Sequence, residues 1–255
     1  MTTKEEDFVS DLFIASTHSY ILFFTDKGKV YALKVYDIPQ AGTAAKGKAI
    51  INILNVSAEK ITAFLSVREF VEGRYIVMAT AQGVIKKSDL MSFANIRSGG
   101  LIAINLDEKD SLISARLTGG KDELFIGTRD GQAIRFNEED VREMGRQARG
   151  VKAMKLGKGD RVVAMEKVEG NSTVLTVTER GYGKRTEFAE YRTTGRGGSG
   201  IINIKITEKN GPVIGIVKVI GADELMISTS TGKIIRIAMK DVAVIGRNTQ
   251  GVKLM

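Results

Sequence analysis

The sequence has no cysteine and no tryptophan, a single histidine and only two prolines. Without cysteine the chain forms no disulfide and no thiolate metal site, which fits a reducing compartment. The lone His18 completes neither a metal-ligand set nor a Ser–His–Asp triad, and we expect it in a turn or at a strand edge. No apolar run is long enough to span a bilayer, and the acidic start, MTTKEEDFVSDL, is unlike a signal peptide. We therefore expect a cytoplasmic protein with no metal and no cofactor.

Glycine, by contrast, is abundant, with 28 copies, and it recurs at a regular interval. One set lies in the turns TDKGKVY, TAQGVIKK, TRDGQAIR, TERGYGKR and TSTGKIIR, and its members are Gly28, Gly83, Gly131, Gly181 and Gly232. A second set has the same spacing of roughly 50 residues and consists of Gly47, Gly100, Gly150, Gly200 and Gly251. Two independent markers with one period indicate five copies of a single structural unit.

Each copy has the pattern of four short strands. The first two are apolar and precede the turn glycine, and the third mixes apolar and basic residues. The fourth follows the second glycine and alternates, as in GVKAMKL, so one of its faces is buried and the other is wet. The expected first strands are Leu12–Ala15, Ile61–Leu65, Leu112–Leu117, Val162–Val168 and Val213–Val219. The best helical candidate, residues 137–145, is either a short helix or a loop turn.

Four strands in every repeat are typical of a blade, because blades arranged radially bury their faces on one another. We predict an all-β, propeller-like disc of five four-stranded blades, in one domain that covers residues 1–255. The expected blades are residues 8–54, 60–106, 111–156, 161–206 and 212–255.

The net charge of +8 is concentrated at two places in each copy. The six residues after each turn glycine and the six that end at each second glycine together hold fifteen basic residues and two acidic ones. Equivalent places in a radial array lie on one ring, which predicts a positive belt around the disc. The candidate DNA-binding residues are these fifteen and two neighbours: Lys29, Lys34, Lys46, Lys48, Lys86, Lys87, Arg97, Arg135, Arg146, Arg149, Lys184, Arg185, Arg192, Arg196, Lys233, Arg236 and Arg247.

A belt of like charge favours a polyanion that follows its curve. Duplex DNA carries about one charge per 1.7 Å of axis. Bending it halfway round such a disc costs on the order of 10 kcal/mol, which a ring of about ten phosphate contacts can offset and one contact cannot. The sequence shows no recognition helix and no zinc-finger spacing, so we expect sequence-tolerant binding through phosphates, by a domain that is a monomer when isolated.

Several stretches resemble the C-terminal domain of the A subunit of bacterial DNA gyrase, and the resemblance covers essentially the whole chain. They are KVYDIPQAGTAAKGKAIINIL (34–54), TAQGVIKKSDLMSF (80–93), YGKRTEFAEY (182–191) and GRNTQGV (246–252). The resemblance implies a β-pinwheel whose blades exchange strands with their neighbours. It also implies a non-catalytic domain that wraps DNA and supports negative supercoiling by an ATP-dependent type IIA topoisomerase. The implied partners are duplex DNA, the ATPase subunit of gyrase, and the rest of the gyrase A subunit, with a location at the nucleoid.

The chain departs from that family at its hallmark, the gyrase A box, which reads Gln-Arg-Arg-Gly-Gly-Lys-Gly or close to it. Only degenerate relatives of the box are present, in QAGTAAKG (40–47) and QARGVKA (147–153). In the family the segment resembling KEEDFVSDLFIAS (4–16) follows the box. The resemblance therefore implies blades two to six of a six-bladed disc, without the blade that bears the box.

Alternative functions remain open at this point. One is the related C-terminal domain from the A subunit of topoisomerase IV, and another is a protein-interaction propeller, which requires an apolar patch on a flat face. A propeller enzyme requires convergent carboxylates, histidine or tyrosine at equivalent strand starts, which the repeats do not supply. The loop TTGRGGSG (193–200) is rich in glycine, but it lacks the Gly-Lys-Ser/Thr ending of a phosphate-binding loop.

Overall fold

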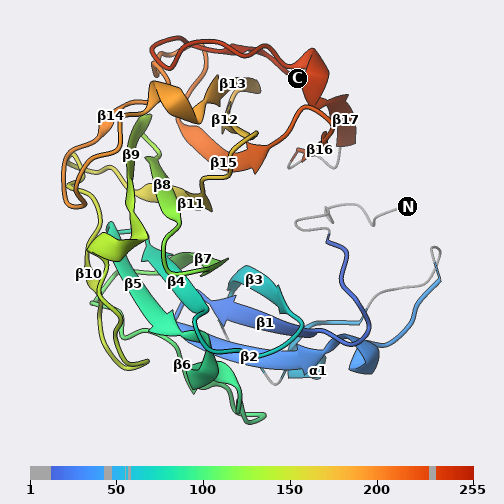
Figure 1. Cartoon of the computed structure of the whole chain (residues 1–255). Coiled ribbons are helices and arrows are strands. Elements are labelled where there is room, and N and C mark those ends of the chain that lie inside the picture. The colour runs from blue at the N-terminus through green and yellow to red at the C-terminus, as the bar shows by residue number, and fades with distance from the viewer. Residues whose placement is uncertain (1–12, 43–47, 55, 57–58, 230–233) are drawn as a thin grey trace.

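The computed structural model describes residues 13–42, 48–54, 56, 59–229 and 234–255. Antiparallel hairpins recur along the chain, and Figure 1 shows them arranged as an open ring. The hairpins are β1 (Tyr20–Thr25) with β2 (Lys29–Lys34), β4 (Tyr75–Thr80) with β5 (Val84–Asp89), β8 (Glu123–Thr128) with β9 (Gln132–Asn137), β12 (Thr173–Thr178) with β13 (Tyr182–Glu187), and β16 (Glu224–Ser228) with β17 (Ile234–Ala238). The predicted all-β, propeller-like class is confirmed.

The first four hairpins turn at glycines of the first set, as the third hairpin illustrates, and Gly232 lies outside the described residues. Gly131 has a φ of +82°, and its N–H donates to the carbonyl of Thr128 at 3.1 Å. The carbonyl of Gly131 accepts the N–H groups of Asn203 and Ile204, at 2.8 and 3.2 Å. A Cβ at Gly131 would lie 2.4 Å from the carbonyl oxygen of Ile204. Glycine is therefore required both by the backbone angle and by the close crossing of the next repeat.

Each complete sheet combines strands from two successive sequence repeats. The strand orders are β3-β1-β2-β6, β10-β5-β4-β7, β11-β8-β9-β14 and β15-β12-β13-β18, and we number these sheets 1 to 4. The hairpin comes from one repeat and the two flanking strands from the next. The inner strands are β3 (Ile61–Val67), β7 (Leu112–Thr118), β11 (Val162–Lys167) and β15 (Val213–Val219), and the outer strands are β6 (Leu101–Ile102), β10 (Val151–Lys152), β14 (Ile201–Ile202) and β18 (Val252–Lys253). The expected blade ranges thus mark repeats of the sequence, and the sheets straddle them.

Sheet 5 contains only β16 and β17 in the described part of the chain. In sheets 1 to 4 the inner and outer strands come from the following repeat. The strand expected at Leu12–Ala15 is wrong for the described residues 13–15, which form none. Equivalent segments pair with the hairpin of a preceding repeat. Phe13 instead lies against Phe64 of β3, with ring centroids 4.4 Å apart, and Ile14 is fully exposed.

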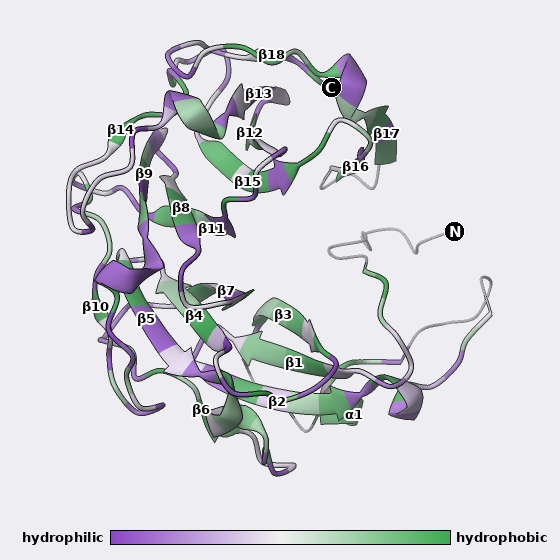
Figure 2. Cartoon of the chain, viewed as in Figure 1, coloured by the Kyte–Doolittle hydropathy of each residue, from purple (hydrophilic) through white to green (hydrophobic). Residues whose placement is uncertain are grey.

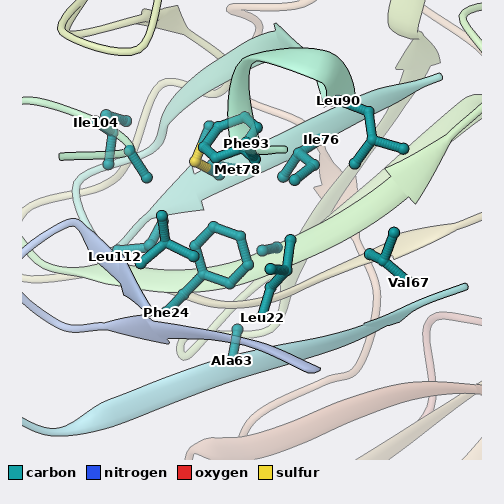
Figure 3. Close-up of a cluster of buried hydrophobic side chains, with 13 residues drawn as sticks. Leu22, Phe24, Ala63, Val67, Ile76, Met78, Leu90, Phe93, Ile104 and Leu112 are labelled. Carbon is teal, nitrogen blue, oxygen red and sulfur yellow. The ribbon is translucent and has the colours of Figure 1, made fainter. Parts of the chain in front are cut away.

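The hydrophobic core is divided into clusters between neighbouring sheets. Leu22 and Phe24 of β1 meet Ile76 and Met78 of β4 between sheets 1 and 2 (Figure 3). Val77, which alternates with them along β4, belongs to the cluster between sheets 2 and 3. Strands such as β4 are therefore buried on both faces, which explains why they read as continuous apolar runs.

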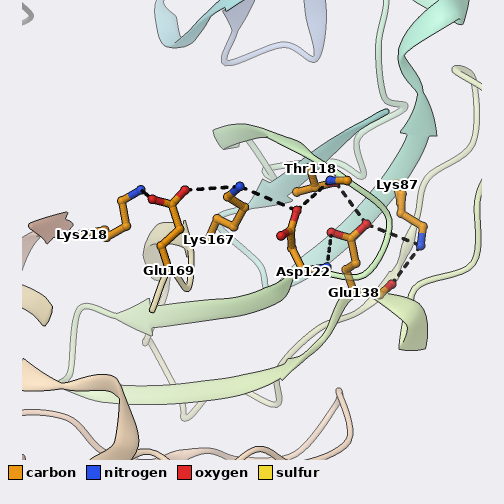
Figure 4. A network of polar contacts seen from close by, with 8 residues as sticks. Lys87, Thr118, Asp122, Glu138, Lys167, Glu169 and Lys218 are labelled. Atoms are coloured by element: carbon orange, nitrogen blue, oxygen red, sulfur yellow. Dashed lines mark hydrogen bonds and ion pairs between the residues drawn. The ribbon is translucent and has the colours of Figure 1, made fainter. Parts of the chain in front are cut away.

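Polar contacts also join the sheets (Figure 4). The Lys218 ammonium lies 2.6 Å from a carboxylate oxygen of Glu169, and Lys167 lies 3.3 Å from the other oxygen of that carboxylate. Glu138 is fully buried and accepts a hydrogen bond from the Thr118 hydroxyl at 3.1 Å. Burial raises the pKa of the Glu138 carboxyl above its usual value. These contacts link β7, β11 and β15 with the loops around them.

Helical structure in the described residues is limited to α1 (Ile51–Leu54) and short 3-10 turns. Within the candidate segment 137–145, only Glu138–Asp140 is helical, as one such turn. None of the described helices is long and apolar enough to cross a membrane.

Candidate nucleic-acid interface

The outer strands and the loops that precede them form the edges of sheets 1 to 4. We define the rim loops as residues 95–100, 145–150, 195–200 and 246–251, and the rim as these loops with the outer strands and their continuations, 101–105, 151–155, 201–205 and 252–253. Figure 1 shows β10 and β14 at the periphery of the ring, and Figure 2 shows hydrophilic stretches of chain beside β10.

Backbone hydrogen bonds join the rim of each sheet to the rim of the next. Asn105 donates to the carbonyl of Ala148 at 3.2 Å, and Lys155 donates to the carbonyl of Gly198 at 2.8 Å. Lys205 donates in the same way to Thr249, at 2.8 Å. The rim is consequently one bonded track that runs from sheet 1 to sheet 4.

Six of the predicted DNA-binding residues lie on or beside this track. Arg97, Arg149, Arg192 and Arg196 are exposed, and Arg146 and Arg247 are half-buried. The Arg196 guanidinium spans two edges, because its Nη1 donates to the carbonyl of Lys152 at 3.0 Å. Arg247 repeats that contact one sheet later, with its Nη1 3.2 Å from the carbonyl of Ile202. Bonds of this kind fix the position of the guanidinium and leave the rim positively charged.

Five other predicted residues use their charged groups inside the protein, so we do not propose them as DNA contacts. The Nζ of Lys87 donates to the carbonyl of Glu138 at 3.1 Å, and Nη1 of Arg135 donates to that of Phe188 at 2.7 Å. Nε of Arg185 donates to the carbonyl of Val242 at 3.0 Å. Each of these cations thus holds the 3-10 turn of the following repeat. Lys86 and Lys184 are completely buried beside them.

Of the remaining predicted residues, Lys29 pairs across sheet 1 with Ile102 of the rim, and the others lie away from the rim or outside the described residues. Lys29 pairs with Glu59 at 2.9 Å, and this hydrogen bond raises the pKa of the lysine. The Lys34 ammonium lies 5.3 Å from the centre of the Tyr36 ring, and hydrogen bonding to Tyr36 raises its pKa. Arg236 forms an ion pair with Glu224, and Lys48 is exposed. Lys46 and Lys233 lie outside the described residues.

Four exposed rim lysines are absent from the predicted set. Each lies on an outer strand or just after one, and they are Lys152, Lys155, Lys205 and Lys253. The alternation of the fourth strand signals Lys152, which follows the half-buried Val151. Lys155 and Lys205 lie three residues beyond the outer strands β10 and β14, and strict alternation does not single them out. These four lysines follow the second glycine of each repeat, and the predicted basic segments end at that glycine.

Positive charge is uneven along the rim. The edge of sheet 2 carries two arginines and two lysines, and the edges of sheets 3 and 4 carry one arginine and one lysine each. The edge of sheet 1 carries only Arg97, with the uncharged Ile102 and Asn105. Arg149 forms an ion pair with Asp107 at 2.7 Å, and both side chains are exposed, at 72% and 57%. An exposed pair is worth little in water, so a phosphate can take the place of the Asp107 carboxylate.

Comparison with known proteins relates the whole chain to one family. The profile of the family described as "DNA gyrase C-terminal domain, beta-propeller" matches residues 19–68, 74–118, 122–169, 172–220 and 223–255. The DNA gyrase A subunit of Klebsiella oxytoca is 47% identical over 253 residues, which are 99% of this chain and 29% of that protein. The Clostridium acetobutylicum protein of the same name is 50% identical over 256 residues, 100% of this chain and 31% of its own length. The chain therefore spans less than a third of these relatives.

Solved structures show the same fold. A structure described as the C-terminal domain of DNA topoisomerase IV superposes with a TM-score of 0.85 and 27% identity, over 94% of this chain and 75% of the other. A DNA gyrase A C-terminal domain superposes with a TM-score of 0.83 and 26% identity, over 98% of this chain and 86% of the other.

Proposed function

Since the chain belongs to the DNA gyrase C-terminal domain family, we propose that it binds duplex DNA along its rim and bends it. In this proposal the chain is a non-catalytic domain of the gyrase A subunit. It acts at the nucleoid with the ATPase subunit of gyrase and with the rest of its own polypeptide, and it supports negative supercoiling. Whole-enzyme activity is part of the proposal, because the chain spans 29–31% of the relatives.

The observation that carries the proposal is the recurrence of exposed and half-buried cations on one bonded track. Arg149, Lys152 and Lys155 lie on the edge of sheet 2, and the edges of sheets 3 and 4 repeat the arrangement with Arg196, Lys205, Arg247 and Lys253. A stiff polyanion that contacts three successive edges of a ring must curve. Because sheet 1 has the fewest rim cations, we place the tightest DNA contact on sheets 2 to 4.

Phosphate contacts on this track provide both the affinity and the bend. Smooth bending of duplex DNA by a right angle costs a few kcal/mol, and each charge-assisted contact contributes roughly 1.5–3 kcal/mol before entropy is counted. Several contacts are needed, which agrees with cations that recur in successive repeats. The rim presents neither a recognition helix nor a zinc finger among the described residues, so binding depends on phosphates and on the ease of bending.

A salt titration tests this function. If about seven rim cations meet phosphates, the logarithm of the affinity should fall with the logarithm of salt concentration with a slope near −6. Duplexes of unrelated sequence but equal length should bind within about tenfold of one another, since phosphates carry no sequence information. The measurement is fluorescence anisotropy of labelled duplexes at several salt concentrations. A slope shallower than about −2 means that the rim is not the binding surface.

The solved topoisomerase IV domain supports a second candidate, the equivalent domain of that enzyme, because its fold superposes equally well. We favour gyrase because the full-length relatives that match at 45–50% identity are gyrase subunits.

A further inference from the structure

Two fully buried lysines lie directly under rim loops. Lys86 on β5 donates from Nζ to the carbonyl of Ala103 at 2.7 Å and also to the carbonyl of Arg146. Lys184 occupies the same position on β13, and its Nζ donates to the carbonyls of Gly246 and Arg247, at 2.7 Å each. Both ammonium groups thus hold the backbone of a rim loop from beneath.

Burial of these groups is costly, and the contacts around them show what offsets the cost. Desolvation lowers the pKa of Lys86 to about 8, and the Arg146 guanidinium acts in the same direction. Desolvation also lowers the pKa of Lys184 to about 8, where Glu190 acts in the opposite direction and Arg247 in the same direction. Two carbonyl bonds per ammonium compensate for the lost water.

The loop of sheet 3 is held differently and provides an internal comparison. Ile134 occupies the position of Lys86 and Lys184 on β9, and a Cβ on Gly198 of that loop would lie 3.7 Å from its side chain. The start of the loop is anchored by a backbone bond in all three sheets, such as Met144 to Lys87 at 2.8 Å and Thr194 to Arg135 at 2.9 Å. In sheets 2 and 4 the hydroxyls of Ser88 and Thr186 also donate to the carbonyls of Met144 and Ile245, at 2.8 and 2.9 Å, where β9 of sheet 3 has Phe136. Sheet 3 therefore has no lysine under the middle of its loop, and its Gly197 N–H donates to the carbonyl of Ala153 at 2.6 Å.

We propose that Lys86 and Lys184 are positioning residues of the DNA interface, which hold two rim loops so that their arginines can reach phosphates. Lys86 supports the loop that carries Arg146 and Arg149, and Lys184 supports the loop that carries Arg247. The inference rests on the proposed function. It also replaces the expectation from sequence that both lysines touch DNA themselves, because neither has any exposed surface.

The test compares Lys86→Met with Lys152→Met in the whole chain. Methionine has a similar length to lysine but no hydrogen-bond donor. In K86M we therefore expect the backbone amide hydrogens of residues 145–150 to exchange at least about tenfold faster than in the wild-type chain. Protection in residues 195–200, which lie over Ile134, should be unchanged. The slope of log affinity for DNA against log salt concentration should become shallower by about 1.8 in K86M, because Arg146 and Arg149 are both displaced. In K152M the slope should become shallower by about 0.9, and the rate of amide hydrogen exchange should not change.

A parallel variant keeps the test independent of the folding of K86M. Lys184→Met should lower protection in residues 246–251 alone and make the slope shallower by about 0.9, because that loop carries one arginine. If the salt slope changes while the loop amides keep their protection from exchange, the lysines act as charges. If the loop amides lose protection while the salt slope is unchanged, the lysines have a merely structural role. Either result overturns the inference. If the wild-type chain binds no duplex, the proposed function fails, and the exchange data still show whether the lysines hold the loops.

Discussion

Reversing the charge of Lys152, Lys155, Lys205 and Lys253 to glutamate should weaken duplex DNA binding by about a thousandfold at about 0.15 M salt. The four lysines are exposed on the edges of sheets 2 to 4, on the track that we assign to DNA. Each reversal removes a cation that meets a phosphate and adds a carboxylate that repels one. Because exposed side chains of this kind are not packed, the free energy of unfolding should change little. Anisotropy titration and urea unfolding of the same preparation give both quantities.

A matched variant separates the rim from net charge. Lys27, Lys60, Lys121 and Lys158 are also exposed, and none lies on an outer strand or a rim loop. Reversing these four produces the same total charge, so only long-range attraction is lost, and we expect a decrease of about tenfold or less. Equal losses in the two variants would show that the chain binds DNA by its overall charge and that the rim has no special role.

Raising the pH from 8 to 10 should stabilise the wild-type chain by about 4 kcal/mol relative to the Lys86→Met/Lys184→Met double variant. The pKa of both buried lysines is about 8 in the folded chain, against an ordinary value of 10.5. Between these values the unfolded chain holds protons that the folded chain has released, so the free energy of unfolding rises with pH. The gain is reversed as the pH falls from 10.5 towards 8, and well below 8 the difference between the two proteins is constant because the lysines are protonated in both the folded and the unfolded chain. Urea unfolding across this range, in both proteins, measures the difference.

Comparison with the double variant cancels the effect of all other titrating groups on the free energy of unfolding, because both proteins contain them. Lys29 and Lys34 have raised pKa values, but they are present in both proteins and cancel in the comparison. If the two stability curves run parallel between pH 8 and pH 10, the ammonium groups are not buried as described, and their role under the rim loops cannot hold.

The repeat and the hairpins could be predicted from sequence because the recurring glycines have strict backbone requirements where the structure describes them. Gly131 needs a positive φ, and Gly200 leaves no room for a Cβ, which would lie 2.4 Å from the carbonyl oxygen of Ala133. Where these two glycines cross, the outer strand of one repeat meets the hairpin of the previous one. Such constraints require glycine at fixed positions in the repeat, so the period of about 50 residues can be recognised in the sequence.

The exchange of strands between repeats could not be predicted from the period itself. A four-strand pattern repeats equally well whether a strand pairs within its own unit or with the previous hairpin. The expectation for Leu12–Ala15 failed at the described residues 13–15, because equivalent segments form strands by pairing with the hairpin of a preceding repeat. The partner of a strand is set by packing around the ring, which a local pattern does not encode.

The roles of the basic residues were only partly predictable. Lysine is rarely buried, so Lys86 and Lys184 read from sequence as surface charges. Neighbouring sheets cover both faces of β5 and β13, so the four central residues of each strand are buried, where a two-layer fold would alternate them between core and solvent. Lys152 was recoverable from the alternation of its strand, because outer strands do have one wet face.

Energy transfer between dyes at the two ends of a duplex tests the central claim most directly. A duplex of about 40 base pairs is much shorter than the persistence length of about 150 base pairs, so it stays nearly straight when free. Our account predicts that transfer rises when the wild-type chain saturates the duplex, and that K27E/K60E/K121E/K158E preserves the rise. Unchanged transfer at proven saturation would contradict it, because DNA would then lie on the protein without following the curve of the rim.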